Sequence, residues 1–353
     1  MSPSTTISLD ISIIICCYRG EKTIRATLQS LETQSLDKSR FEVIIVDDGS
    51  KDNSSTIIKD YIENNSISKN PYFKYFRKAN EGLSIARNFG LKKSNADLLV
   101  YIDEDAIASQ DYLKTIVEYF ENNQNINCLG GEIELYDGQG EFAKLLQDSI
   151  FSLYMKDINS IIGTNMAFRK KFLIDVGGFQ PEFTYRGDET ALFEKAGTKI
   201  VKGRNRKMVV KHCQPENQKA WLKTRYENGF FKMAIDFFIK KPKFLIYFNL
   251  IKSLVFVSTP FMIIIAIVLM FFSTEASIVL FLITFLLLLR KFIFNNLISN
   301  TLKELSRNRN DMVNLKDKTL LVKLIIMGVF KSEIGYLMGY VKFKDVVWEK
   351  SFI

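Results

Sequence analysis

Cysteine and histidine are scarce in this chain of 353 residues. The four cysteines are Cys16, Cys17, Cys128 and Cys213, and no two of them have the C-x-x-C spacing of a zinc or redox site. We therefore expect reduced cysteines that pack as small apolar side chains, as in cytosolic proteins. Residues 1–4 provide no basic leader in front of an apolar stretch, so we expect the amino-terminal part to stay in the cytoplasm.

The composition excludes a wholly disordered protein, because 47% of the residues are hydrophobic and 25% are charged. The length is sufficient for a core domain and an additional region. The net charge is +9, and lysine and arginine are concentrated after about residue 200, beside long apolar runs. This combination favours an anionic membrane surface over nucleic acid as the partner of the basic residues.

Short apolar runs in the first third of the chain end abruptly in acids. The run Phe41–Val46 ends in Asp47 and Asp48, and the run Leu98–Ile102 ends in Asp103, Glu104 and Asp105. Such runs, alternating with helical patterns, predict a parallel doubly wound α/β sheet. Ligands of these sheets bind beyond the carboxyl ends of the strands. Asp103 and Asp105 therefore predict a metal–phosphate site, and the alternative is a solvated acidic loop.

The last third of the chain is more apolar than the rest. We divide the chain into a domain at 1–235 and a membrane-associated helical region at 236–353, with apolar helices at about 253–272, 276–298 and 320–341. The first has 20 residues without a charge, enough to span the hydrocarbon core of a bilayer. Basic residues flank the outer ends of the first two segments, which predicts a hairpin with both ends in the cytoplasm. The third segment contains charges, so it fits an interfacial or bundle-packed helix.

Six short motifs lie in order between residues 10 and 230. They are Cys17–Glu21, Val46–Ser50, Asn80–Gly82 with Ala86–Asn88, Asp103–Asp105, Gly187–Thr190, and His212. Together they resemble the family 2 inverting glycosyltransferases of the GT-A fold, whose members include exopolysaccharide and lipid-linked glycan glycosyltransferases. The resemblance implies a Rossmann-like α/β domain with a mostly parallel sheet and flanking helices, followed here by carboxyl-terminal membrane helices.

The resemblance implies a site for a divalent metal and a nucleotide-sugar. Asp105 corresponds to a metal ligand, Asp103 to a residue that contacts the ribose or the metal, and His212 to a metal or phosphate contact. The cofactor would be Mn²⁺ or Mg²⁺, because hard oxygen ligands suit these ions and a divalent cation stabilises the charge of a leaving diphosphate.

Four further residues correspond to nucleotide contacts of the family. Asp48 matches the aspartate that accepts a hydrogen bond from the nucleobase, and Tyr18 would lie near the base or ribose. Glu21 would approach the nucleoside, and Arg87 matches an arginine near the nucleotide. The family often has asparagine after the aromatic residue, where this chain has Arg19.

An acidic pair at the start of a helix corresponds to the catalytic base. Inversion by a single displacement needs a base that takes the proton of the acceptor hydroxyl. The family has Glu-Asp here, whereas this chain has the reverse order, Asp188-Glu189. By position Glu189 matches the base, with Asp188 as the alternative.

We therefore expect a membrane-anchored enzyme that moves one sugar from a nucleotide-sugar to a lipid-linked or other glycan acceptor at the cytoplasmic face. UDP is the commoner partner of the aspartate at position 48, and GDP remains open. The QxxRW motif of processive synthases is missing, which favours transfer of one sugar per encounter. The alternatives are a polyprenyl-phosphate sugar synthase and, in another class, a catalytically silent membrane scaffold. The sequence leaves the oligomeric state open and gives no reason to expect nucleic acid as a partner.

Overall fold

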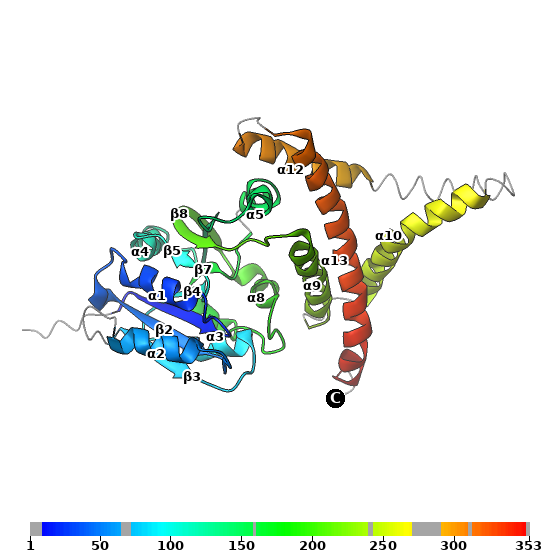
Figure 1. Cartoon of the computed structure of the whole chain (residues 1–353). Coiled ribbons are helices and arrows are strands. Elements are labelled where there is room, and N and C mark those ends of the chain that lie inside the picture. The colour runs from blue at the N-terminus through cyan, green and yellow to red at the C-terminus, as the bar shows by residue number, and fades with distance from the viewer. Residues whose placement is uncertain are drawn as a thin grey trace, which may run out of the picture. The chain divides into compact units, whose positions relative to one another are not determined.

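The computed structural model describes residues 9–64, 72–157, 160–238, 243–269, 291–309 and 313–350 (Figure 1). Their internal contacts divide the chain into two units. Unit 1 comprises residues 1–139 and 154–214, and unit 2 comprises 140–153 and 215–353. The domain boundary expected between 235 and 236 stays a prediction.

Unit 1 is built on a single sheet of eight strands. The strands are β1 (Ile11–Cys17), β2 (Phe41–Asp47), β3 (Phe73–Arg77), β4 (Leu98–Asp103), β5 (Ile107–Ala108), β6 (Cys128–Leu135), β7 (Asn165–Arg169) and β8 (Lys202–His212). Their order across the sheet is β3-β2-β1-β4-β7-β6-β8-β5. The first four neighbours are parallel, as the sequence predicts.

The second half of the sheet is mixed, so the expectation of a mostly parallel sheet holds only in part. β7 runs antiparallel to β4 and β6, and β5 runs antiparallel to β8, while β6 and β8 are parallel. The strands that the sequence predicted are apolar runs with both faces buried, which is typical of a parallel sheet. β8 is partly exposed along its length and carries a polar sequence, so its pattern alone predicts its pairing poorly.

Helices cover both faces of the parallel half of the sheet. They are α1 (Ile24–Glu32), α2 (Ser54–Asn64), α3 (Leu83–Lys93), α4 (Tyr112–Asn122), α7 (Lys170–Asp175) and α8 (Asp188–Ala196), with short 3₁₀ turns η1 (Lys38–Arg40) and η3 (Gly197–Lys199). Alternate residues of a strand point to opposite faces. Ile14 and Ile44 accordingly share a core with residues of α3, α7 and α8. Ile13 and Ile15 are also fully buried, so helices must cover the other face.

The cysteines of unit 1 behave largely as expected. All four are free, and Cys17 and Cys128 are buried within the sheet. Burial raises the pKa of the Cys17 thiol to about 12, which keeps it protonated and unreactive at neutral pH. Cys213 is exposed and does not belong to a core.

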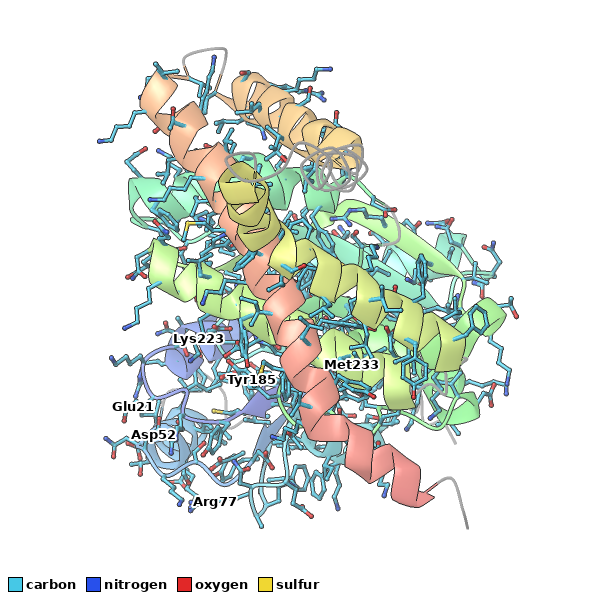
Figure 2. The ribbon with its side chains drawn as sticks, turned by 90° about the vertical axis from the view of Figure 1, so that its right-hand side faces the viewer. Glu21, Asp52, Arg77, Tyr185, Lys223 and Met233 are labelled. Atoms are coloured by element: carbon cyan, nitrogen blue, oxygen red, sulfur yellow. The ribbon has the colours of Figure 1, made fainter. Side chains whose placement is uncertain are left out.

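Unit 2 is helical. Its elements are α5 (Glu141–Leu146), the π-helical turn η2 (Gln147–Phe151), α9 (Gln218–Phe238), α10 (Lys243–Leu269), α12 (Lys291–Asn308) and α13 (Leu315–Lys350), and α6 (Ser152–Met155) follows η2. α9 and α13 pack side by side (Figure 1). Gly229 and Gly335 lie in this contact, where a Cβ atom would meet backbone atoms of the opposite helix. Met233, labelled in Figure 2, packs with Ile246 of α10 and Tyr336 of α13.

The three expected apolar segments fall partly outside the described residues. Segment 253–272 is helical to Leu269 within α10, and segment 276–298 is described only from Lys291 onward. Segment 320–341 lies within α13, which packs against α9 and α10. Among the residues that the structure describes, no helix combines the length and the apolar character needed to cross a membrane.

Candidate functional site

The candidate site lies where three adjacent parallel strands end at one edge of the sheet. In the register of the sheet, Cys17 of β1 is level with Asp47 of β2, and Cys16 is level with Asp103 of β4. The loops that follow these strands therefore start side by side. This is the edge at which open α/β sheets bind ligands.

Two carboxylates and an imidazole form a group that could hold a metal ion. Asp103 and Asp105 come from the end of β4, and His212 from the end of β8. One ligand atom from each lies within 4.8 Å of the others, and His212 Nε2 is 3.2 Å from Asp105 Oδ1. Carboxylate oxygens with one imidazole nitrogen fit Mn²⁺ or Mg²⁺, with the remaining positions left to water or phosphate oxygens. Among the described residues, this is the group of three histidine, cysteine or acidic side chains that could hold a metal ion. All three residues were expected at a metal site from the sequence.

The imidazole and the carboxylate of this cluster perturb one another. Burial by itself would lower the pKa of His212, but the hydrogen bond with Asp105 outweighs it and raises the pKa. Burial would likewise raise the pKa of Asp105, but the hydrogen bond from His212 lowers it. Without a metal the pair thus favours a charged imidazolium and an ionised carboxylate. A divalent cation would take the place of that proton, so metal binding should release protons.

Arg87 of α3 is buried between two carboxylates of the site. Its Nη2 is 3.3 Å from Asp103 Oδ1, and its Nη1 donates to Asp188 Oδ2 at the start of α8. Its side chain is only 3% exposed. Burial by itself would lower the pKa of Arg87, but Asp188 and then Asp103 raise it above its ordinary value. Arg87 therefore stays charged and links Asp103, Asp105 and His212, which we call the metal-type cluster, to α8. Its expected contact with a nucleotide stays a prediction.

The two acids at the start of α8 have different environments. Asp188 is buried and paired with Arg87, whereas Glu189 is partly exposed. Burial, and next the charge of Asp188, raise the pKa of Glu189 to about 8. A general base works best when its pKa lies near the operating pH. Asp188 thus anchors Arg87, while the assignment of the catalytic base to Glu189 stays a prediction.

Asp48 holds the loop between β3 and α3. Its Oδ1 accepts hydrogen bonds from Lys78 Nζ at 2.6 Å and from the backbone N–H of Glu81 at 3.1 Å. Its Oδ2 accepts one from the N–H of Gly82 at 2.8 Å. The carboxylate is 4% exposed and retains at most part of its acceptor capacity for a ligand. The contact with a nucleobase that the sequence suggested for Asp48 stays a prediction.

A cleft of about 570 Å³ opens beside the metal-type cluster. It is lined by Arg19, Glu21, Lys22, Thr23, Lys51, Asp52, Glu104 and Asp105. Asp105 thus belongs both to the cluster and to the wall of the cleft. The three basic side chains come from the loop after β1 and the loop after β2, and the lining also contains four acids, Glu21, Asp52, Glu104 and Asp105. The volume is in the range of small-molecule sites.

The loops around the cleft are tied to one another. The N–H of Glu21 donates to Asp52 Oδ2 at 3.3 Å, and Glu21 Oε2 accepts from the N–H of Asn53 at 3.1 Å. Figure 2 shows Glu21 and Asp52 next to each other. Tyr18 is 39% exposed, with the guanidinium of Arg19 5.2 Å from its ring centre. Glu21 thus lines the cleft and Tyr18 precedes the cleft residue Arg19, while their expected contacts with the nucleoside stay predictions.

Several residues of the cleft were not singled out from the sequence. Arg19 has a φ of 62°, a left-handed conformation that non-glycine residues adopt rarely and that is often found at functional sites. Lys22, Lys51 and Asp52 lie in ordinary polar loops, and only their convergence in space marks them. Glu104 had no assigned role. It lines the cleft, and burial, followed by the charge of Asp105, raises its pKa to about 8.

Gly82 provides a test of the loop that Asp48 holds. Its φ is +98°, and a Cβ atom there would lie 2.5 Å from Thr184 Cβ. We expect Gly82→Ala to cost roughly 1–3 kcal/mol of folding free energy from the backbone strain, and more from the clash. The matched control is Gly138→Ala, where φ is +84° but no atom lies within 4 Å of the added Cβ. Equal losses in urea denaturation of the two variants would show that the contact with Thr184 has no effect.

Models of two protein families match the chain. The one described as Glycosyl transferase family 2 matches residues 12–177, and the one described as Glycosyl transferase family group 2 matches residues 98–292, more than half of the chain. The matched regions together include every member of the candidate site from Tyr18 to His212.

The matches with two curated relatives cover different shares of those relatives' lengths. A glucosyl-dolichyl phosphate glucuronosyltransferase from Haloferax volcanii is 21% identical over 250 residues, which are 65% of this chain and 78% of the relative. A poly-beta-1,6-N-acetyl-D-glucosamine synthase from Staphylococcus epidermidis is 29% identical over 177 residues, which are 47% of this chain and 41% of the synthase. The chain thus spans less than half the length of the second relative.

A solved structure has a similar fold. The crystal structure of S. aureus TarS 1-349 in complex with UDP-GlcNAc gives a TM-score of 0.51 at 16% sequence identity, and the match covers 96% of this chain and 92% of that chain. At this identity the likeness shows a shared fold.

Proposed function

Because the chain belongs to the family 2 glycosyltransferases, we propose that it transfers a single sugar from a nucleotide-sugar to an acceptor hydroxyl with inversion at the anomeric carbon. One observation carries the proposal: Asp105 is shared by a group that fits a divalent metal and by a cleft lined with three cations. A nucleoside diphosphate needs both features, because its charge grows when the sugar leaves.

The proposed chemistry assigns separate tasks to the residues of the site. Asp103, Asp105 and His212 would hold Mn²⁺ or Mg²⁺, which when bound stabilises the negative charge of the leaving diphosphate. Arg19, Lys22 and Lys51 would attract the anionic donor into the cleft. Uridine is the nucleoside that we propose, with guanosine as the alternative.

Glu189 would carry out the proton transfer. It takes the proton of the acceptor hydroxyl while the oxygen forms a bond to the anomeric carbon of the donor. The bond between that carbon and the phosphate oxygen breaks on the opposite face, and the nucleoside diphosphate leaves with the electron pair. Arg87 pairs with Asp188 beside Glu189, and the charge of Asp188 raises the pKa of Glu189 while that of Arg87 lowers it.

The acceptor is proposed to be a lipid-linked or other glycan, reached at the cytoplasmic face of a membrane to which the chain is anchored. The support is the uncharged sequence 253–272, the basic residues around it, and the dolichyl phosphate in the name of one relative. The alternative acceptor is a polyprenyl phosphate itself. Both proposals would fail if the purified protein consumed no sugar nucleotide with any extract of lipid-linked acceptors or polyprenyl phosphates.

A panel of sugar nucleotides tests the donor. We expect thermal stabilisation of the full chain by one uridine or guanosine diphosphate sugar in the presence of Mn²⁺, and a smaller shift when the metal is chelated, because binding to the folded state raises stability by mass action. No shift with any nucleotide would overturn the proposed function.

Replacing Asp105 tests the metal site. Loss of a residue that hydrogen-bonds a metal ligand weakens metal binding roughly 10- to 100-fold. We expect Asp105→Asn, which removes a ligand itself, to weaken Mn²⁺ binding by more than this. The matched control is Asp137→Asn, since Asp137 is exposed and pairs only with Lys211 on the surface. Both variants are titrated with Mn²⁺ in the presence of uridine diphosphate, with the free ion followed by electron paramagnetic resonance. Equal affinities would exclude Asp105 as a ligand.

A further inference from the structure

Unit 2 contains a second hollow, which we call the α12–α13 groove. It has a volume of about 730 Å³ and is lined by Ile298, Ser299, Leu302, Lys303, Ser306, Arg307 and Lys318. All but Lys318 belong to one face of α12, and Lys318 lies in the first turn of α13. The lining therefore combines three cations, two hydroxyls and two apolar side chains, with no acid.

The positive charge of the groove is not neutralised by its neighbours. Lys303, Arg307 and Lys318 form no ion pair with any residue that the structure describes. Lys303 and Arg307 lie four residues apart on a helix, a spacing at which like charges repel. No described residue offsets this repulsion with an ion pair, and a bound anion would reduce it.

The acids nearest in sequence are engaged elsewhere. Glu304 is buried and accepts hydrogen bonds from Ser152 Oγ at 2.9 Å and Asn308 Nδ2 at 3.3 Å. Asp317 Oδ2 lies 3.2 Å from Arg309 Nη1, and Arg309 Nε is 2.8 Å from Asp148 Oδ2. These contacts tie the end of α12 to the start of α13 and to η2, so they also hold the two walls of the groove together.

The apolar side chains of the lining precede the basic ones along α12. Ile298 lies in its amino-terminal half, Leu302 directly precedes Lys303, and Arg307 lies next to its last residue, so Ile298 is about 13.5 Å from Arg307 along the axis at 1.5 Å per residue. Leu297, next to Ile298, is 40% exposed. A ligand that matches this order has an apolar chain at one end and an anionic group at the other.

We infer that the α12–α13 groove binds an acidic phospholipid, with the phosphate against Lys303, Arg307 and Lys318 and the start of an acyl chain against Ile298 and Leu302. Guanidinium and ammonium groups are the usual partners of phosphate oxygens. A nucleic acid or a free phosphate would use the cations but not the apolar part of the lining, where Ile298 and Leu302 are only partly buried against the core around Leu305 and Leu321. The uncharged sequence 276–289 shortly before α12 agrees with a lipid occupant. This inference goes beyond the transfer reaction and does not depend on it.

Short-chain lipids below their micellar concentration provide the test. The full chain is titrated by calorimetry with dihexanoyl phosphatidic acid, dihexanoyl phosphatidylcholine, and glycerol 3-phosphate. We expect the phosphatidic acid to bind at least roughly tenfold more tightly than the other two, because glycerol 3-phosphate has no acyl chain to bury and phosphatidylcholine has a zwitterionic headgroup with no net negative charge for the cations. Equal binding of glycerol 3-phosphate would show a free phosphate site, and equal binding of phosphatidylcholine would show a nonspecific apolar site. Either result overturns the inference.

Variants that reverse the charge of groove residues test whether phosphatidic acid binds in the α12–α13 groove. We expect Lys303→Glu with Arg307→Glu to weaken phosphatidic acid binding at least roughly tenfold, and Lys318→Glu on the other helix to weaken it in the same direction. The matched control is Lys316→Glu, since Lys316 is exposed on α13 but does not line the groove. If the double variant does not fold, as judged by circular dichroism, Lys318→Glu carries the test. Unchanged binding in folded variants of the groove, or the same loss in the control, overturns the inference.

Discussion

Glu189→Gln is expected to lower kcat by roughly 10²–10⁴-fold, the usual contribution of a general base. Glutamine keeps the size and the hydrogen-bonding capacity of the side chain but cannot take a proton. Binding of the sugar nucleotide should persist, because the proposed donor contacts lie in the cleft and at the metal-type cluster. The measurement is steady-state transfer kinetics alongside calorimetric titration of the donor.

The neighbouring acid is the control that separates catalysis from structure. Asp188→Asn leaves Arg87 with one charged partner instead of two, so we expect it to lower thermal stability as well as activity. Full activity of Glu189→Gln together with an inactive but stable Asp188→Asn would assign the base to Asp188. Full activity of both would favour a phosphate acceptor, which needs less help from a base.

The pH profile gives a second readout of Glu189. A carboxyl with its pKa raised to about 8 is protonated at lower pH and cannot act as a base there. We expect kcat/KM to fall about tenfold for each pH unit below about 8, because this ratio reports the ionisation of the free enzyme. In the residual activity of Glu189→Gln this limb should vanish, and its persistence there would assign the titration to another group.

Arg87→Met is expected to destabilise the chain by about 3–5 kcal/mol, the cost of removing one member of a buried ion pair. The methionine fills much of the space but leaves Asp103 and Asp188 facing each other without a cation. Urea denaturation followed by circular dichroism measures the effect.

Arg77→Met is the matched control for the arginine. Arg77 is 52% exposed and lies 3.5 Å from Asp47, and Figure 2 shows it at the surface. Asp47 itself is buried, but it keeps the hydrogen bonds from Tyr75 Oη and from the backbone N–H of Ser50 without Arg77, so we expect Arg77→Met to cost less than Arg87→Met. If the two variants were equally stable, the buried bridge would have no special part in holding the site together.

The sequence predicted the strands and the acids at their ends, because local pattern and chemistry coincide there. Runs such as Phe41–Val46 and Leu98–Ile102 are apolar on both faces, which indicates buried parallel strands, and the acids at their ends indicate the edge where ligands bind. The structure confirms both strands and brings Asp103 and Asp105 next to His212. The histidine was named through the family resemblance, since a lone histidine after a polar strand has no local signal of its own.

Interactions between residues of unit 1 that are far apart in the sequence could not be predicted from local sequence patterns. Arg87 and Asp188 are 101 positions apart, and their pairing follows from the contact of α3 with the start of α8. Lys22 and Lys51 look like ordinary solvated lysines until the loops after β1 and β2 place them around one cleft with Arg19. The periodicity of the sequence does not predict such convergence, because the convergence depends on the order of strands in the sheet.

The sequence by itself determined the parallel strands, the acids at their ends and the family, because apolar runs and motif order are properties of neighbouring residues. Only the tertiary structure decided that the sheet is mixed beyond β4, that Asp48 holds a loop, and that Arg87 lies buried between Asp103 and Asp188. It also placed the two helix-start acids in different environments, Asp188 paired with Arg87 and Glu189 beside it. The physical reason is that burial and charge, which set the ionisation of Glu189, come from residues that meet only in the fold.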